Sequence, residues 1–107
     1  MYSKIYQIEV PGLAEGKIAA AFMAEELTPL ISRYNMAGLS VFLCKEGMVQ
    51  ITVNFDSPGD MKLFQEAQEQ IFAQLKNSFS CSTGEYQAVP VFRYEREATN
   101  SSMQMTH

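Results

Sequence analysis

Large aromatic side chains are the residues of this chain best suited to hold a small molecule. Several large rings on both sheet and helices pack irregularly and can line a pocket, although the same rings can simply fill the core of a small domain. Both interpretations stay open from the sequence. The candidate lining residues are Tyr6, Phe22, Phe42, Phe55 and Phe64.

Two polar residues are candidates for orienting a ligand at the mouth of that pocket. Arg93 is suited to an anionic head group because its guanidinium fork matches two carboxylate oxygens. Tyr34 can supply a further hydrogen bond. The alternative for Arg93 is a surface ion pair with Glu95 or Glu85.

The candidates for catalysis are weaker. Glu26 falls near the apolar face of a predicted helix, where a half-buried acid can act as a base, but it can equally reach solvent at a helix break. Cys44 lies in an apolar run and is expected to be a buried structural thiol. The single histidine, His107, ends the chain, so the sequence supplies no evident ligand set for a metal and predicts no cofactor.

Hydrophobic patterning predicts the order strand, helix, strand, strand, helix, strand. Pro29 falls inside the first helix and predicts a kink or break near residues 25–28, with Thr28 capping the restarted segment. The second helix begins in segment 56–60, where a capping side chain precedes a proline. The expected strands are 2–10, 39–44, 48–55 and 85–95, and the expected helices are 13–34 and about 58–78.

This order is typical of an α+β, ferredoxin-like βαββαβ domain, here residues 1–96, followed by a polar tail, 97–107. The expected antiparallel sheet has the strand order 4-1-3-2 and carries both helices on one face. Pro90 in the last strand suits an edge position. The opposite face is expected to carry Leu39, Val41 and Leu43, and an apolar patch of that kind predicts a homodimer with the two sheets face to face.

Three short segments carry a resemblance to known proteins. Val10-Pro11-Gly12 closes the first strand, Met36-Ala37-Gly38-Leu39-Ser40-Val41 opens the second, and Phe55-Asp56-Ser57 leads into the second helix. Over residues 4–95 the chain resembles the dimeric α+β barrel superfamily, and within it the antibiotic-biosynthesis-monooxygenase-like proteins. The resemblance implies a face-to-face dimer and a pocket between each sheet and its own helices.

The same resemblance limits the chemistry. Cofactor-free quinol oxygenases and haem-degrading enzymes belong to this group, and a Trp and a His often stand where this chain has Phe55 and Phe64. A phenyl ring neither ligates iron nor moves a proton, so the domain offers no histidine for haem. If the protein is an enzyme, we expect it to resemble a cofactor-free monooxygenase.

Composition excludes other classes. The net charge of −4 argues against nucleic-acid binding, which needs a positive patch, and no run approaches the roughly 20 apolar residues that span a membrane. The chain starts directly with a strand pattern rather than a secretory signal, which predicts a cytoplasmic protein with free thiols at Cys44 and Cys81.

Two function classes remain open. The first is a small-molecule-binding protein, or a cofactor-free enzyme, that holds an apolar or amphipathic ligand between sheet and helices. A fatty-acid-like or polycyclic aromatic molecule fits the predicted lining. The alternative is a structural or regulatory dimer with a packed core and no ligand. Whether the space under the first helix is hollow or packed separates the two.

Overall fold

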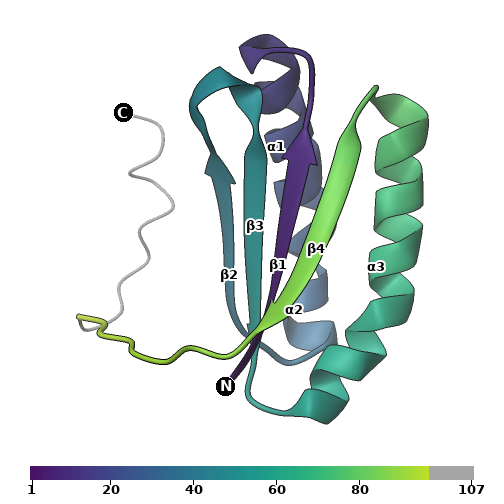
Figure 1. Ribbon diagram of the computed structural model, residues 1–107. Helices are drawn as coiled ribbons and strands as arrows, with labels where there is room; N and C mark the ends of the chain where they lie inside the picture. The colour runs from purple at the N-terminus through teal and green to yellow at the C-terminus, as the bar shows by residue number, and fades with distance from the viewer. Residues whose placement is uncertain (97–107) are drawn as a thin grey trace.

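One four-stranded antiparallel sheet organises the protein in the computed structural model, which describes residues 1–96 (Figure 1). The strands lie side by side in the order β2-β3-β1-β4, which is the predicted order read from the other edge. The elements are β1 (Tyr2–Glu9), α1 (Leu13–Leu27), α2 (Leu30–Arg33), β2 (Met36–Leu43), the 3-10 turn η1 (Lys45–Gly47), β3 (Val49–Phe55), α3 (Pro58–Ser78) and β4 (Ser82–Ala88).

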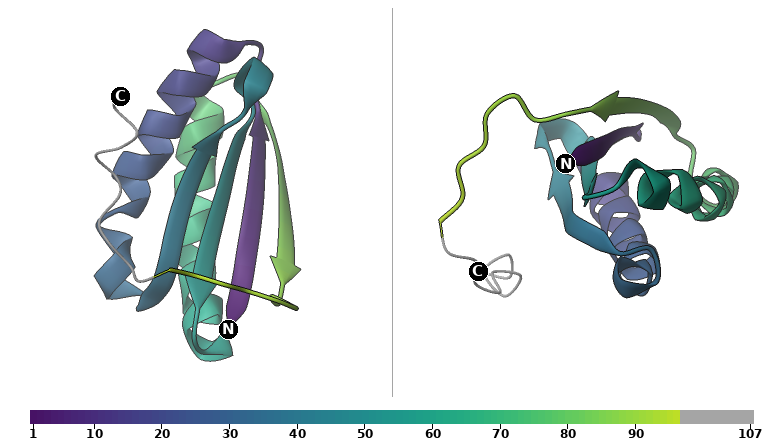
Figure 2. Two further views of the ribbon diagram at one scale, coloured as in Figure 1. Left: turned by 90° about the vertical axis from the view of Figure 1, so that its left-hand side faces the viewer. Right: turned by 90° about the horizontal axis from the view of Figure 1, so that it is seen from below.

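The molecule has two layers. Helices α1 and α3 lie against the same face of the sheet, and no other element of residues 1–96 covers the opposite face (Figure 2). The predicted ferredoxin-like α+β fold is therefore confirmed.

Alternation in β3 builds the centre of the core. Every second residue of this strand points toward the helices and is fully buried, whereas the residues between them lie half-exposed on the other face. Helix α3 closes the core from above with its predicted apolar stripe. The completely buried residues of these two elements are Val49, Ile51, Val53, Phe55 and Leu75.

The predicted break at Pro29 is confirmed. Helix α1 ends at Leu27, and α2 restarts at Leu30. The proposed cap at Thr28 is wrong, because its hydroxyl donates backward to the carbonyl oxygen of Ala24, 2.6 Å away, and gives no hydrogen bond to α2. This hydrogen bond therefore stabilises the last turn of α1 and does not cap α2.

The predicted facing of β2 is wrong. Leu39 pairs with Val53 and Val41 pairs with Ile51, so both side chains point toward the helices and pack against the core. Phe42, which pairs with Gln50, therefore points to the opposite face and is 51% exposed. An irregularity between Met36 and Gly38 and the positive φ at both Glu46 and Gly47 determine this register, and neither is evident from alternation alone.

The last strand is shorter than predicted. It ends at Ala88, two residues before Pro90, and its final partner is Ser3. Proline has no backbone donor and β1 begins at Tyr2, so Tyr2 leaves room for only one further pair, with Val89, before Pro90. Residues 89–96 continue outside the sheet without regular secondary structure and bend at Val91 and Phe92.

Candidate functional site

The space beneath the first helix is packed. Phe64 and Phe55 are 1% and 0% exposed, and their ring centroids lie 5.7 Å apart. Tyr34 meets Phe64 edge to face at 5.6 Å. As predicted, Phe64 lies between helix and sheet beside Phe55, where it fills core volume.

The other predicted site residues lie apart from this cluster. Phe22 is half-buried against Phe79, and Phe42 lies on the opposite face of the sheet. Arg93 lies beyond β4, where its guanidinium pairs with the Glu95 carboxylate at 2.9 Å. The structure therefore does not bring Phe42 or Arg93 to the other predicted residues.

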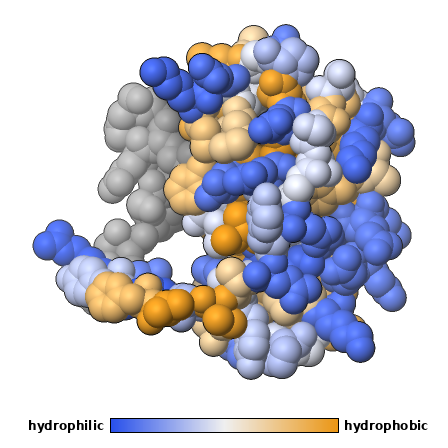
Figure 3. Space-filling view, in the orientation of Figure 1, coloured by the Kyte–Doolittle hydropathy of each residue, from blue (hydrophilic) through white to orange (hydrophobic). Residues whose placement is uncertain are grey.

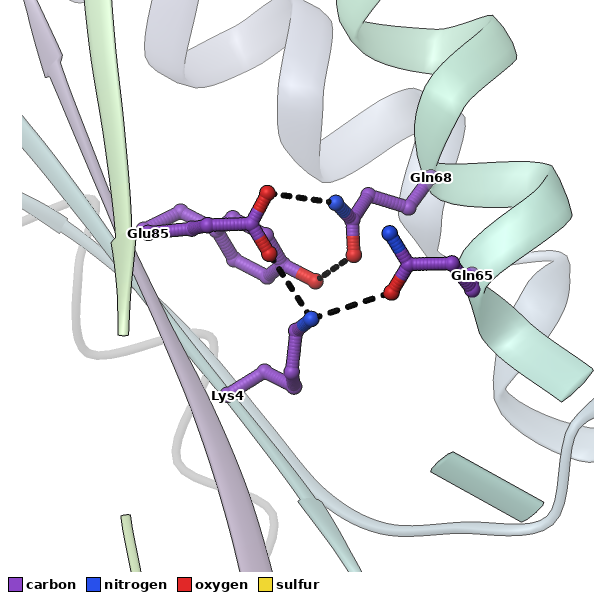
Figure 4. A network of polar contacts seen from close by, with 5 residues as sticks. Lys4, Gln65, Gln68 and Glu85 are labelled. Atoms are coloured by element: carbon purple, nitrogen blue, oxygen red, sulfur yellow. Dashed lines mark hydrogen bonds and ion pairs between the residues drawn. The ribbon is translucent and has the colours of Figure 1, made fainter. Parts of the chain in front are cut away.

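Tyr6 belongs to a different cluster, which the sequence did not predict. Lys4 and Tyr6 are neighbours on the helix-facing side of β1, and Glu85 projects from β4, where it is the direct partner of Tyr6. Helix α3 contributes Gln65 and Gln68 from above. Figure 4 shows Lys4, Gln65, Gln68 and Glu85 converging between the strands and this helix.

The five side chains form one hydrogen-bonded network. The Lys4 ammonium lies 2.7 Å from a carboxylate oxygen of Glu85 and donates to the Gln65 side-chain oxygen at 3.1 Å. The Tyr6 hydroxyl donates to the oxygen of Gln68 at 2.5 Å, and the amide nitrogen of Gln68 donates to the other Glu85 oxygen at 3.0 Å. These partners fix the side-chain amide of Gln68 in one orientation.

Burial and charge set the protonation of this network. The hydrogen bond from Lys4 is the largest effect on the pKa of Glu85, and together with the Lys4 charge and Gln68 it holds that pKa below its usual value despite partial desolvation. Burial raises the pKa of Tyr6 far above its usual value, and the Glu85 charge adds to the shift. The phenol thus remains protonated and acts as a donor.

A groove opens beside this network. It has a volume of about 390 Å³ and lies between α3 and the β1–β4 strands. The rings of Tyr6 and Phe72, with centroids 5.0 Å apart, form its apolar wall. Its polar and small residues are Gln68, Glu69, Ala73, Lys76, Thr83, Gly84 and Glu85.

A second groove of about 250 Å³ lies between α3 and the region where the first helix breaks into α1 and α2. Glu26 and Tyr34 both line it, together with Arg33 and Glu66. Glu26 is half-buried there, yet the described residues provide no hydrogen-bond network around it comparable with the one at Glu85. The groove beside α3 is therefore the better-organised site.

The missed residues had a weak signal in the sequence. Lys4 has the same strand parity as Tyr6 and Ile8, and Gln68 lies four residues after Phe64 and three before Ile71 on the apolar stripe. Polar residues at such positions are buried only when they find partners. The partner, Glu85, comes from the last strand, so the cluster becomes evident only once the strand order is known.

Solved structures share this architecture. A dimeric ferredoxin-like protein from an uncultured marine organism superposes with a TM-score of 0.72 at 15% identity, over 89% of this chain and 98% of that chain. A proposed antibiotic biosynthesis monooxygenase from Deinococcus radiodurans superposes with a TM-score of 0.60 at 17% identity, over 90% of this chain and 100% of that chain. Both neighbours are consistent with the resemblance to the dimeric α+β barrel superfamily.

A de novo designed ferredoxin-fold protein also matches, with a TM-score of 0.57 at 12% identity over 92% of this chain and 94% of that chain. A fold that a designed sequence can adopt does not by itself imply a function. Comparison with protein-family models finds no match, and comparison with curated proteins finds none either. The likeness therefore establishes the fold, and function must be argued from the site.

Three further properties of the described residues follow from their composition and placement. Within residues 1–96, no three side chains of His, Cys, Asp or Glu gather into a possible metal site. In the same part of the chain, every helix is too short or too polar to cross a membrane. Cys44 and Cys81 are free thiols, both half-buried.

Proposed function

We propose that this protein binds a small amphipathic molecule in the groove between α3 and the β1–β4 strands. One observation carries the proposal: an aromatic wall of Tyr6 and Phe72 stands beside a hydrogen-bonded polar row in a groove of about 390 Å³. Small-molecule sites commonly combine apolar walls with a few fixed polar groups. The network holds Glu85 as a charged acceptor beside the groove.

The charges narrow the ligand class. Glu69 and Glu85 both line the groove, whereas Lys76 is its one lining cation and is exposed. A fatty-acid carboxylate would face two like charges. A flat aromatic compound that carries a hydroxyl group can instead stack on Phe72 and donate to Glu85. Of the two ligand classes suggested by the sequence, the polycyclic aromatic one fits better.

The test compares three probes of known chemistry by calorimetry: 2-naphthol, 2-naphthoate and decanoate. We expect 2-naphthol to bind, and both anions to bind at least about tenfold more weakly. Amide chemical-shift changes on adding 2-naphthol should concentrate in residues 68–76 and 83–85. Shifts concentrated around Glu26 and Tyr34 would instead place binding in the other groove.

Two matched variants give the control. Phe72→Ala removes the stacking surface and should weaken 2-naphthol binding at least about fivefold, because one ring stacking contact contributes about 1 kcal/mol beyond its buried area. Glu26→Gln alters a half-buried acid in the other groove and should leave binding unchanged. Circular dichroism of both variants checks that they are folded.

The second candidate is a structural or regulatory dimer without a ligand. The packed core favours it, because Phe55, Phe64 and Met23 are at most 1% exposed and leave no hollow under α1. Failure of all three probes to bind would make this the better account.

We also propose that the open face of the sheet forms a homodimer interface. The neighbour described as dimeric supports this by its fold, at 15% identity. The face is mostly polar, with three larger apolar side chains: Ile5, Phe42 and Tyr86. Interfaces between separately folded subunits commonly have such a mixed composition.

A further inference from the structure

The segment after the last strand carries an unusual amount of exposed apolar surface. We call residues 89–96 the C-terminal arm. Val89, Val91, Phe92 and Tyr94 are 61%, 99%, 86% and 77% exposed. The arm leaves β4, crosses the end of the sheet and projects clear of it, away from the helices (Figures 1 and 2). Figure 3 shows its hydrophobic side chains standing apart from the body. Soluble monomers rarely present such a segment to water.

The arm cannot lengthen its own sheet. The β1–β4 ladder ends at the pair Ser3–Ala88, and Pro90 then removes a backbone donor. Within the described chain, the side-chain hydrogen bonds of the arm are those of Arg93, to Glu95 and to the sulfur of Met1. Neither contact buries the apolar side chains. Val89 borders a small groove beside Tyr2 and Met61, whereas Val91, Phe92 and Tyr94 stay at least 77% exposed.

A suitable receptor lies at the other edge of the sheet. Strand β2 pairs with β3 on one side only, so among the described strands its outer edge is unpaired. An apolar groove of about 360 Å³ runs along this edge. An unpaired strand edge beside apolar pockets is the arrangement that accepts an extended segment as an added strand. The groove is lined by Ala24, Thr28, Ile31, Met36, Ala37, Gly38, Leu39 and Val41.

We propose that the arm of one copy adds to the β2 edge of a second copy as a fifth strand. The free arm bends at Val91 and Phe92, so pairing as a strand requires it to straighten there. Alternation along the straightened arm would place Val89 and Val91 on one face and Phe92 and Tyr94 on the other. The two valines suit the groove on the helix side. The two aromatic rings then lie on the open face of the sheet, where Phe42 is 51% exposed.

Distance excludes the arm's own β2 edge as the receptor. Three spacings of about 4.8 Å separate the outer strands, so crossing the sheet takes about 14 Å, or about four extended residues. Val89 and Val91 fall within those four residues, so they would lie across the sheet and could not reach the groove at the β2 edge. The receptor must therefore be in another subunit, and symmetry makes the exchange reciprocal.

Disulfide trapping between two differently labelled proteins tests this contact. In a background of Cys44→Ser and Cys81→Ser, one protein carries Val91→Cys and the other carries Ser40→Cys or Val41→Cys. We expect a covalent heterodimer on oxidation after mixing. The control partner carries Gln74→Cys on the exposed side of α3. Trapping no stronger with β2 than with this control would overturn the proposal.

Dilution experiments give a second, independent test. A chain ending at Ala88, and separately Val91→Asp, should raise the dimer dissociation constant at least about tenfold, which corresponds to about 1.4 kcal/mol. Gln70→Asp on α3 is the control. An unchanged dissociation constant in the truncated chain would overturn arm exchange. The groove beside α3 lacks arm residues, so binding of 2-naphthol to the truncated chain tests that site separately.

Discussion

At the scale of single residues, the least expected feature is a lysine inside the domain. The Lys4 side chain is 3% exposed, whereas that of its ion-pair partner, Glu85, is 46% exposed. The pair is therefore asymmetric. Water can solvate the carboxylate if it loses its partner, but it cannot readily reach the ammonium.

This asymmetry predicts that the two partners contribute unequally to stability at pH 7. Lys4→Met removes the buried charge, keeps most of the packing and leaves a carboxylate that water can reach, so we expect a cost of about 1 kcal/mol. Glu85→Ala leaves the buried Lys4 ammonium with Gln65 as its remaining partner. We expect this to lower the unfolding free energy by roughly 2–3 kcal/mol, which is less than breaking a fully buried ion pair costs. Urea unfolding measures both. A larger cost for Lys4→Met would contradict the proposed burial of the charge.

The lowered pKa of Glu85 predicts how stability depends on pH. The unfolded chain takes up the proton first, so the stabilisation is complete above the ordinary glutamate pKa of about 4.3 and is lost as pH falls from there through the folded-state pKa. The difference in unfolding free energy between wild type and Glu85→Gln should therefore shrink as pH falls below about 4.3. Tyr6→Phe is the control. The wild-type Tyr6 phenol stays protonated throughout, so the effect of Tyr6→Phe on the unfolding free energy should not change with pH in that range.

At the scale of elements, three glycines bring α1 against the β2–β3 turn. An added Cβ at Gly16 would lie 2.3 Å from the carbonyl oxygen of Gly47, and one at Gly47 would lie 2.3 Å from that of Gly12. Gly47 also has φ +99°, which strains any other residue. Backbone therefore meets backbone here, with no side chain between that could yield.

The close approach reverses the usual effect of replacing a helical glycine. Alanine in a helix interior ordinarily stabilises by about 0.5–1 kcal/mol relative to glycine. Gly16→Ala should instead destabilise by about 1–3 kcal/mol, because α1 must move away from the turn. Thermal and urea unfolding measure the effect. Gly59→Ala in the first turn of α3 is the control, since its added Cβ would meet only the Ser57 hydroxyl oxygen, at 3.3 Å. Equal effects at both positions would contradict this account.

The sequence predicted elements better than it predicted which way they face. Periodicity identified α3, Pro29 marked the break in the first helix, and Ser57 accepts from Gly59 and Asp60 as its capping role requires. The prediction of which β2 side chains face the helices was wrong, because the register of β2 depends on a local irregularity and on a turn with two positive φ values. A shift of one residue exchanges the two faces of a strand.

The candidate site was harder to predict, for a related reason. Only Tyr6 among the predicted lining residues borders the groove beside α3. The other groups come from positions that alternation and helical periodicity assign to the core or to the surface. Lys4 and Gln68 are buried because Glu85 lies between them, and that proximity is a property of strand order rather than of either segment.

At the scale of the whole molecule, the uncovered sheet face decides between a monomer and a dimer. The predicted apolar patch on this face is wrong, because Leu39 and Val41 pack under the helices. The face nevertheless carries Ile5, Phe42 and Tyr86 among polar side chains, and the arm projects on the same side. A second copy would cover both the sheet face and the arm.

A charge at the centre of the open face should therefore dissociate the dimer without unfolding the subunit. Thr52 is suited to this test because it is half-buried and lies between Ile5 and Ser40 on the two neighbouring strands. In a monomer the ammonium of Thr52→Lys can reach water along its flexible stem, so we expect a change in stability below about 1 kcal/mol. In a face-to-face dimer two such ammonium groups approach across the symmetry axis and lose water, which should shift the protein toward monomer.

Sedimentation velocity over a range of concentrations measures this shift. Gln74→Lys adds the same charge on the exposed side of α3 and should leave the association unchanged. The result also separates the two proposed contacts: if Thr52→Lys still forms dimers but loss of the arm abolishes them, exchange of the arm holds the subunits together. If the wild-type chain is a monomer at every concentration, both contacts are wrong. The exposed arm would then need a partner of another kind.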